Sequence, residues 1–598
     1  MTLLTGFFRN KLPRWVAPTF LAVCAFLAFL ETLPATISFE DSAEFVTASA
    51  SLGIAHPSGY PLYVLLGKAF SLLPFGTIPW RLALFSAVCA SAALAVLFVV
   101  ARALVEAAGE RVDVMTELLM VAVLGALAFS PTWWSQAVYA KVYALHVLLL
   151  GAVALFLLRW SSRKKTGDLF LTSLFFGLAC ANHLFLTLAI GPWLLAALAI
   201  GQRQALRWRH ALIAAFGGAL GLLPYLYILL RMPSAPYATV TFNHASQLRK
   251  FVMRSNYADV GVGGSDKFGL VASFGQSAYA DVGLVILLLA IVGAVVLIRR
   301  KSAASPLIAG VVTAPLLVIG LRSFGFSEVV SYIYRVYGLP SEAFAAMLAA
   351  VGVSVAWNAA VVRRAGVFRY VLAALIIALP ACVAVNAAPV VRVTTDPFID
   401  IWLRGTLASL PPNAALIVAE DGLVSDTELF GLAYLQVVEG ARRDVTVVTD
   451  TGVRPFYRPK LPAGEPQFPL TMRRRMLLEA AMKDVVLKGR PLFTSFAPET
   501  VSKRTISRAT GYAFALDRNA PLPSAPQFHL PADAIASYAV SAIAAHLSYL
   551  QASRISEISG AKAALPTLLE AMRLDPVPES GDYLGFVHHR SATAKVER

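Results

Sequence analysis

The chain has 598 residues, of which 58% are hydrophobic and only 14% are charged. Soluble domains carry roughly 25% charged residues, so this composition excludes an ordinary water-soluble globular protein. The net charge is +16, but the basic residues lie in short clusters between apolar segments. They form no continuous basic surface, which argues against a nucleic-acid partner. The chain is therefore predicted to lie in a lipid bilayer.

About eleven apolar segments are predicted to cross the membrane, where a spanning helix needs roughly 20 apolar residues. The first runs into an acidic stretch without a small-residue cleavage site, so we predict an uncleaved anchor. Two short segments meet at Asn182 and His183, and we predict two helices there, with one broken helix as the alternative. All four cysteines lie in apolar runs, as expected of buried thiols and not of a disulfide framework. The predicted spans are 15–38, 80–104, 115–130, 137–158, 168–182, 184–201, 210–230, 278–298, 304–322, 339–361 and 369–388.

Clusters of Lys and Arg between the spans set the predicted topology, because basic residues accumulate in short cytoplasmic loops. The N-terminus is predicted to be cytoplasmic and the C-terminal domain to lie outside. Three outer loops are long enough to build a site: 39–79, 231–277 and 323–338. Alanine-rich spans and a cysteine-free outer domain are compatible with a multi-pass protein of a bacterial inner membrane, with its C-terminal domain in the periplasm.

The composition after residue 388 is that of a water-soluble domain. Strands and a helix alternate at its start, which predicts an α/β domain with a parallel sheet, and its end reads as helical. The fold class is thus a polytopic α-helical membrane protein with a C-terminal α/β domain that ends in helices. The predicted domains are 1–388 (membrane), 389–525 (α/β) and 526–598 (helical), with strands at 415–419, 445–448, 491–496 and 512–517 and helices at 426–439, 531–554 and 561–574.

The strongest candidate for chemistry follows the first span, where Asp41 and Glu44 are three residues apart. On a helix that begins at Asp41, the two carboxylates share one face. Apolar surroundings and like charge raise the pKa of a carboxyl group, which suits a general base near neutral pH. The same spacing is also that of a capping box, in which acidic side chains only satisfy free backbone N–H groups.

A rigid segment follows, with the sequence His56-Pro57-Ser58-Gly59-Tyr60-Pro61. Two prolines and a glycine fix an irregular backbone, which is tolerated at membrane depth where it lines a cavity. This context favours a functional role over capping for the two carboxylates. We predict that His56 and Tyr60 contact the substrate.

Several motifs resemble those of a known family. They are Asp41-x-x-Glu44-Phe45, Leu52-Gly53-Ile54-Ala55-His56-Pro57-x-Gly59-Tyr60-Pro61-Leu62-Tyr63, Trp134-Ser135-Gln136, Val142-Tyr143-Ala144-Leu145, Ala181-Asn182-His183 and Gly221-Leu222-x-Pro224-Tyr225-Leu226-Tyr227-x-x-x-Arg231. The set is similar to that of bacterial relatives of the transmembrane protein 260 family, whose vertebrate member is a protein O-mannosyltransferase. The resemblance covers most of the first 340 residues, is highly specific in the first outer loop and extends loosely into 434–445.

The family is placed in the GT-C superfamily of membrane glycosyltransferases, which take a sugar from a polyprenyl-phosphate carrier. The resemblance implies that Asp41 is the catalytic base with Glu44 as its neighbour, and it points to mannose transferred to protein. Protein, lipid and glycan acceptors all stay open. One position departs from the family pattern: Lys141 stands where an acid is expected, which puts a role for a second outer-loop carboxylate in doubt.

Transfer from a lipid phosphate needs a carboxylate for the hydroxyl proton, cations for the departing phosphate and a cavity open to the lipid. A single displacement inverts the anomeric centre, and no metal or other cofactor is expected, because no His/Cys/Asp cluster appears at ligand spacing. For the phosphate we favour Arg231 and Arg335, with Arg249, Lys250 and Arg254 as alternates. Snorkelling to lipid headgroups, or an aromatic interfacial belt around Arg335, is the structural alternative.

Further polar and aromatic side chains complete the predicted donor site. Tyr143 and Tyr334 are expected to contact the substrate, with packing as the alternative. Asn182 and His183 form a polar pair at membrane depth, where a hydrogen bond between helices explains them as well as contact with a sugar does.

Three functions stay open: an inverting glycosyltransferase, a transporter or flippase for a lipid-linked substrate, and a catalytically silent scaffold. Transporters place interrupted helices near the midplane in both halves, whereas the irregular segments here gather at one surface, which favours the enzyme. Asp421, Asp426 and Asp444 in the C-terminal domain have no partners at diagnostic spacing, so no catalytic role is predicted for them.

Overall fold

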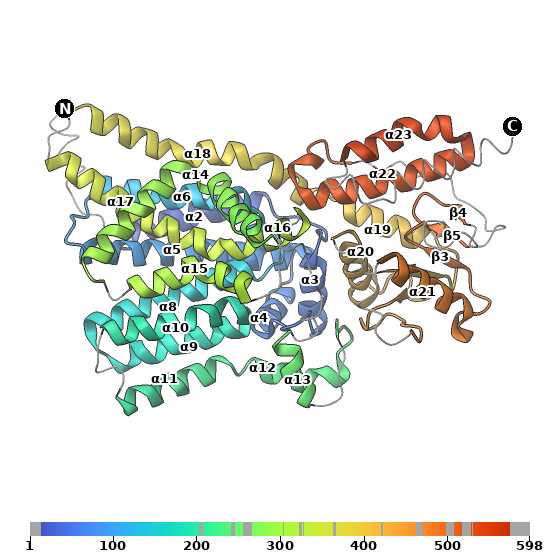
Figure 1. The fold of residues 1–598 in the computed structure, drawn as a ribbon, viewed down its shortest axis with the longest axis horizontal. Helices are drawn as coiled ribbons and strands as arrows, with labels where there is room; N and C mark the ends of the chain where they lie inside the picture. Colours follow the sequence, from blue (N-terminus) through green and yellow to red (C-terminus); the bar gives the residue numbers. More distant parts are fainter. Residues whose placement is uncertain are drawn as a thin grey trace.

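The computed structural model places a long helical bundle beside a smaller part that contains the sheet (Figure 1). Asp421, considered above, lies outside the described residues. The structure describes residues 13–201, 207–240, 245–254, 266–302, 304–321, 326, 328–362, 366–419, 423–461, 470–497, 507–516, 528 and 530–574.

A helix overlaps each of the eleven apolar segments predicted from sequence. The helices of this part are α2 (Val16–Glu31), α3 (Asp41–Ser51), α4 (Pro61–Ser71), α5 (Ile78–Ala107), α6 (Val114–Ala128), α7 (Pro131–Val138), α8 (Tyr143–Arg163), α9 (Thr166–Asn182), α10 (Leu184–Gly201), α11 (Trp208–Gly221), α12 (Tyr225–Arg231), α13 (Ala245–Val252), α14 (Lys267–Arg299), α15 (Ser305–Leu321), α16 (Glu328–Tyr334), α17 (Leu339–Val362) and α18 (Phe368–Thr395).

Not all of these helices are long enough to cross a bilayer. Among the described residues, six helical stretches have the length and apolar composition of a span, or seven if the bent pair α6 and α7 counts as one. This number is lower than the predicted eleven because helices such as α2 and α15 have only 16 and 17 residues, fewer than the roughly 20 that a straight span needs. The chain is a multi-pass membrane protein.

The predicted join at Asn182 and His183 is a hairpin of two helices. α9 ends at Asn182 and α10 begins at Leu184. A Cβ atom added at Gly191 of α10 would lie 3.6 Å from Phe176 of α9, so α10 folds back along α9. This contact excludes a single broken helix.

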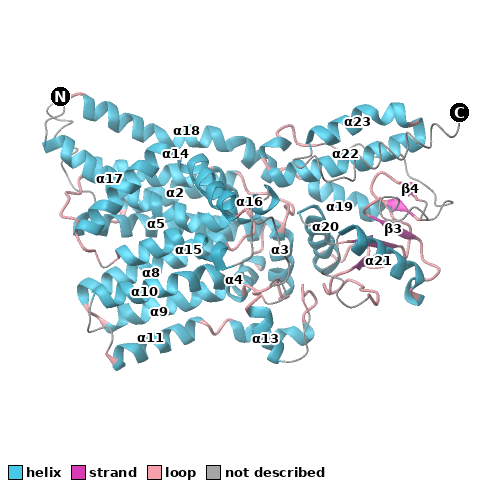
Figure 2. Cartoon of the chain, viewed as in Figure 1, coloured by secondary structure: helices cyan, strands magenta, loops and turns pink. Residues whose placement is uncertain are grey.

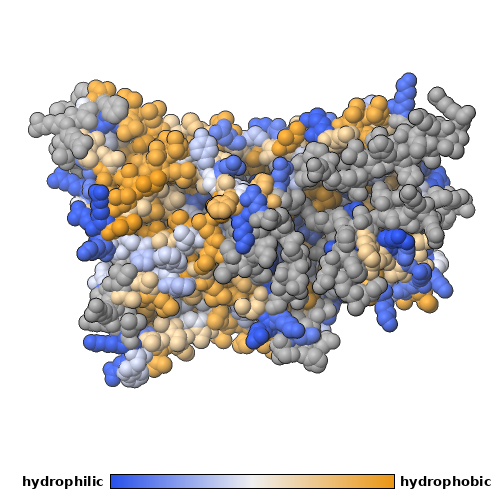
Figure 3. All heavy atoms as spheres, viewed as in Figure 1, coloured by the Kyte–Doolittle hydropathy of each residue, from blue (hydrophilic) through white to orange (hydrophobic). Residues whose placement is uncertain are grey.

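The outside of the bundle is apolar, as a lipid environment requires. Large side chains such as Leu195, Ile291 and Leu375 are 60–66% exposed. Figure 3 shows apolar residues over much of the visible face of the bundle and polar residues at its left end. A soluble monomer does not expose so large an apolar surface, so these side chains face lipid.

The C-terminal part contains a mixed sheet, and Figure 2 shows strands only there. Its strand order is β2-β1-β3-β5-β4. β1 is parallel to β2 and β3, as predicted, whereas β5 is antiparallel to β3 and β4. The elements are α19 (Phe398–Ser409), β1 (Ala415–Val418), α20 (Leu423–Ala433), the π-helical turn η5 (Tyr434–Val438), β2 (Thr446–Thr449), α21 (Leu470–Lys483), β3 (Leu492–Thr494), β4 (Arg508–Ala509), β5 (Phe514–Ala515), α22 (Tyr538–Ser559) and α23 (Ala561–Leu574).

The C-terminal part is docked on two segments that connect apolar helices, 39–79 and 231–277. The Glu40 N–H donates to Thr427 Oγ1 at 3.0 Å, and α20 and η5 pack against α3. The backbones of Ala238 and Arg454 exchange two hydrogen bonds of 3.3 and 2.8 Å. The predicted domain boundary at 388/389 falls inside α18, because the helix continues through Pro389 to Thr395.

Candidate active site

The site is built around α3, which begins at Asp41 as predicted. Its N-cap residue is Glu40, which has a left-handed φ of 56°, and no side chain caps the helix. The capping-box interpretation is therefore wrong, because the Asp41 and Glu44 carboxylates are used elsewhere. Asp41 faces a cavity, and Glu44 faces the segment that follows the helix.

Glu44 is completely buried, and three hydrogen bonds hold its carboxylate. Its Oε1 accepts hydrogen bonds from the His56 N–H at 2.7 Å and from Thr239 Oγ1 at 2.8 Å, while its Oε2 lies 2.5 Å from His56 Nδ1. A carboxylate that is buried with these three partners is not accessible to a substrate. The predicted catalytic role of Glu44 is thus replaced by a positioning role.

His56, which Glu44 holds in place, is in turn hydrogen-bonded to Tyr60. The His56 Nε2 atom lies 3.0 Å from the Tyr60 hydroxyl, and both side chains line the cavity. Burial lowers the pKa of His56, but Glu44 and Asp41 outweigh it, so that the pKa lies above its ordinary value. The Glu44, His56 and Tyr60 chain therefore fixes one wall of the cavity.

Gly59 allows the backbone to turn between His56 and Tyr60. Its φ is +86°, and an added Cβ would lie 2.6 Å from Ile228 Cδ1 and 2.9 Å from Phe251 Cε1. Only glycine has no side chain to clash at such a position and adopts this φ freely. The segment predicted to be rigid is thus held against α12 and α13.

We expect Gly59→Ala to destabilise the protein by about 2 kcal/mol or more, because it adds strain at positive φ to overpacking. A thermal unfolding curve in detergent would show a lower Tm. Gly109→Ala is the matched control, since Gly109 has φ +79° but no atom within 4 Å of its added Cβ. Equal Tm values for the two variants would show that the close packing at Gly59 is not important.

Lys141 pairs with the acidic start of α3. Its Nζ lies 3.0 Å from Glu40 Oε2 and 3.2 Å from Asp41 Oδ2, and the lysine itself is buried. Burial raises the pKa of Asp41, but Lys141 and then His56 outweigh it, so the pKa lies below its ordinary value. The expectation of a raised carboxyl pKa is wrong for Asp41, because the departure from the family pattern supplies a compensating charge.

The cavity has a volume of about 100 Å³ and lies at the end of the bundle that faces the C-terminal part. The Asp41 side chain is 36% exposed toward it. The predicted residues Tyr143 and Tyr334 line it, as does Tyr337. Asp41 is therefore an accessible carboxylate in a wall of aromatic rings.

Two further charged residues line the cavity: Arg254, an alternate for the phosphate, and Asp426, for which the sequence predicts no role. Arg254 follows α13, lines the cavity and donates from Nη1 to the Tyr337 hydroxyl at 3.1 Å. Asp426 of α20 lines it from the C-terminal part. Neither had a sequence signal beyond its charge, because each is brought to Asp41 by contacts between distant segments.

The two favoured arginines lie elsewhere. Arg231 donates from Nε to the Leu52 carbonyl at 2.8 Å and from Nη2 to the Ser51 carbonyl at 3.3 Å, so it caps the C-terminus of α3. Arg335 lies with its Cζ 4.3 Å from the centre of the Tyr332 ring. Neither lines the cavity, and the prediction that they hold the phosphate is not supported.

Asn182 and His183 lie behind the cavity wall. Asn182 donates from Nδ2 to the Val142 carbonyl at 3.0 Å, just before α8. The His183 ring packs 5.8 Å from Tyr60, 5.8 Å from Tyr143 and 5.2 Å from Tyr337, measured between ring centres. The alternative of a contact between helices is correct for Asn182, and His183 supports three lining tyrosines.

Asp41, Glu44 and His56 are also the residues in the described part of the chain that could hold a metal ion. Their ligand atoms lie within 4.8 Å of one another, a cluster that spacing along the sequence did not reveal. However, both Glu44 oxygens and both His56 ring nitrogens already have hydrogen-bond partners within the protein. A cation would have to displace these hydrogen bonds.

Fold and site together define a class: a multi-pass membrane protein with an ionised carboxylate in a polar cavity at one end of its bundle. Residues 41–208, which supply half of the residues that line this cavity, match the family model described as the protein O-mannosyl-transferase TMEM260 N-terminal domain. The resemblance predicted from the motifs is confirmed for these residues.

Curated relatives carry the same name. The mouse protein O-mannosyl-transferase TMEM260 is 27% identical over 485 residues, covering 76% of this chain and 65% of the mouse protein. The protein of that name from Dictyostelium discoideum is 22% identical over 261 residues, covering 40% of this chain and 30% of the relative. The chain thus matches slightly less than two thirds of the mouse relative's length.

Solved structures show a looser similarity. The Archaeoglobus fulgidus oligosaccharyltransferase in the apo form aligns over 70% of this chain and 64% of its own, with 13% identity and a TM-score of 0.47. ArnT from Cupriavidus metallidurans bound to undecaprenyl phosphate aligns over 84% of this chain and 98% of its own, with 12% identity and a TM-score of 0.46.

Proposed function

We propose that this protein is a membrane glycosyltransferase that moves a sugar from a polyprenyl-phosphate carrier to an acceptor hydroxyl. The observation that carries the proposal is the accessible, ionised Asp41 in a cavity that also presents the Arg254 cation. The named activity of the mouse homologue supports the same reaction class and points to mannose and a protein acceptor.

In the proposed step the acceptor oxygen bonds to the anomeric carbon as the bond from that carbon to the phosphate oxygen breaks. The hydroxyl proton passes to Asp41, and the carrier leaves as a lipid phosphate next to Arg254. A carboxylate of low pKa is a weak base, but it is sufficient here, because the hydroxyl becomes acidic as it bonds to a carbon with oxocarbenium character. A single displacement of this kind inverts the anomeric centre.

The remaining features of the proposal concern topology and cofactors. We place the Asp41 cavity and the C-terminal part outside the cytoplasm, as the distribution of basic loops predicts, with eleven helices contributing to a GT-C-like membrane domain. The proposed step uses no metal, because Glu44 and His56 are engaged in hydrogen bonds with each other and with Thr239 and Tyr60. Transfer is therefore expected to survive dialysis against EDTA.

The test uses the full chain purified in detergent, with radiolabelled polyprenyl-phosphate mannose and a membrane extract as the source of acceptors. Label should pass to extract components with the parent protein and fail to pass with Asp41→Asn. If the well-folded parent transfers no sugar from mannosyl or other hexosyl lipid phosphates, the protein is a transporter or a silent scaffold and the proposal is wrong.

Lys141→Met should shift the pH dependence of kcat/KM. Lys141 favours the charged form of Asp41, so its removal raises the pKa, and the inactive protonated form persists to higher pH. The acidic limb of the profile is expected to move upward. Lys68→Met is the control, because Lys68 donates to the Ala50 carbonyl and not to a carboxylate; superimposable profiles for all three proteins would contradict the role of Lys141.

A further inference from the structure

A second cavity lies at the other end of the bundle and has a volume of about 610 Å³. α8 connects the two: Tyr143 at its start lines the Asp41 cavity, and Arg163 at its end lines this one. A helix of 21 residues is about 30 Å long, which is roughly the thickness of the hydrocarbon core. The second cavity therefore lies at the opposite face of the membrane.

The cavity is strongly basic. Glu106 is its one acidic lining residue and lies 3.3 Å from Arg14 and 3.4 Å from Arg102; Arg102 also pairs with Glu117. In the part of the chain that the structure describes, the other three lining arginines have no carboxylate partner. The five arginines, which come from the segment before α2 and from α5, α8 and the end of α14, are Arg14, Arg102, Arg159, Arg163 and Arg300.

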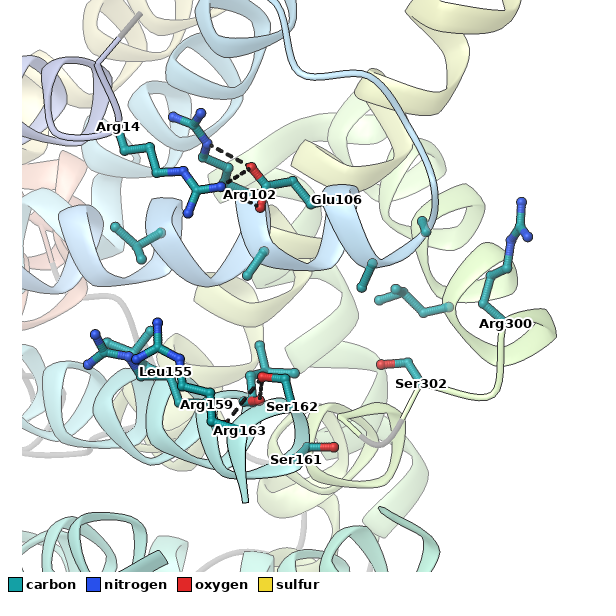
Figure 4. Close-up of a pocket in the computed structure, with 16 residues that line it drawn as sticks. Arg14, Arg102, Glu106, Leu155, Arg159, Ser161, Ser162, Arg163, Arg300 and Ser302 are labelled. Atoms are coloured by element: carbon teal, nitrogen blue, oxygen red, sulfur yellow. Dashed lines mark hydrogen bonds and ion pairs between the residues drawn. The ribbon is translucent and has the colours of Figure 1, made fainter. Parts of the chain in front are cut away.

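The wall between these arginines is apolar. Val99 of α5, Leu155 and Leu158 of α8, and Leu297 of α14 line the same cavity. Figure 4 shows the Arg14, Arg102 and Glu106 group on one side and Arg159 and Arg163 on the α8 side, with Ser302 between α8 and the helix that carries Arg300. Cations around an apolar wall match an amphiphile that has an anionic head and a hydrocarbon tail.

We propose that this cavity binds the phosphate headgroup of an anionic membrane lipid. Arginine offers several donors in a planar fork that fits phosphate oxygens, and the leucine and valine side chains offer a surface for the start of the acyl chain. The tendency of basic residues to lie in cytoplasmic loops explains the sign of the charge at this face. It does not explain why four separate segments direct arginines into one cavity with an apolar wall.

The shared chemistry is a phosphate ester, which a lipid or a soluble metabolite can supply, and the experiment separates the two sources. The full-chain protein in an uncharged maltoside detergent is titrated with dihexanoyl phosphatidylglycerol, with the zwitterionic dihexanoyl phosphatidylcholine and with sn-glycerol 3-phosphate, and Tm is followed. A ligand that binds only the folded state raises Tm with its concentration. We expect phosphatidylglycerol alone to do so.

The double variant Arg159→Gln with Arg163→Gln should weaken the apparent affinity for phosphatidylglycerol by about tenfold or more, because it removes two charged hydrogen-bond donors from the cavity. Arg207→Gln with Arg209→Gln is the matched control, because Arg207 is the N-cap residue of α11, Arg209 lies in its first turn, and neither lines the cavity. It should bind as the parent does. Arg300→Gln replaces the first pair if that variant does not fold.

Three results would overturn the proposal. The first is an absence of any phosphatidylglycerol shift in the parent protein. The second is an equal loss of affinity in the cavity variant and in the α11 control, which would indicate general surface charge. The third is an equal shift with glycerol phosphate, which would assign the cavity to a soluble anion. The Asp41 reaction is not involved in any of these measurements.

Discussion

Replacement of Asp41 by Asn should lower kcat for sugar transfer by roughly 10³-fold, because a positioned general base contributes 10²–10⁴-fold. The amide keeps the size of the side chain but cannot accept the hydroxyl proton. Binding of the lipid donor should change little, so the loss appears in kcat and not in KM. Initial rates with labelled donor over a range of donor concentrations separate the two constants.

Asp426→Asn is the matched control for Asp41→Asn. Asp426 also presents a carboxylate to the cavity, but from α20 of the C-terminal part. If any negative charge in the cavity were sufficient, the two variants would lose activity equally. We expect Asp426→Asn to keep kcat within about tenfold of the parent, since Asp426 takes no part in the proposed proton transfer. A fully active Asp41→Asn protein would remove Asp41 from the mechanism.

Replacement of Arg254 by Gln should lower kcat/KM for the lipid donor by about 10–100-fold, because a hydrogen bond to a charged group is worth roughly 1.5–3 kcal/mol. Arg254 is the arginine that lines the Asp41 cavity. The effect should appear mainly as a higher KM for the phosphate-bearing donor. KM for the acceptor should not change.

Arg231→Gln distinguishes this role from a merely structural one. Arg231 binds the Leu52 and Ser51 carbonyls at the end of α3, so its loss should lower Tm and leave the donor KM near that of the parent. The opposite pattern, in which Arg231→Gln raises the donor KM and Arg254→Gln does not, would show that Arg231 binds the phosphate, as the sequence predicts.

The arrangement of helices was largely predictable, because the apolar runs that produce it are local. The helix that begins at Asp41, the break between α9 and α10, and the alternation of β1, α20 and β2 were all placed within a few residues. The number of crossings was less predictable, because composition marks an apolar helix without showing whether it extends through the bilayer. The antiparallel half of the sheet depends on pairing between distant segments, which local patterns do not encode.

The sequence by itself determined that this protein lies in a membrane, and its motifs singled out Asp41, His56, Tyr60 and Tyr143, which line one cavity in the structure. Hydropathy identifies the apolar segments, and the motifs identify the residues of the candidate site. Only the tertiary structure decided that Glu44 orients His56 while Asp41 remains accessible, that Lys141 lowers the pKa of Asp41, and that Arg254 replaces Arg231 in the cavity. The physical reason is that the direction and the partners of a charged side chain are set by packing between segments far apart in the chain, whereas its presence is set by the sequence alone.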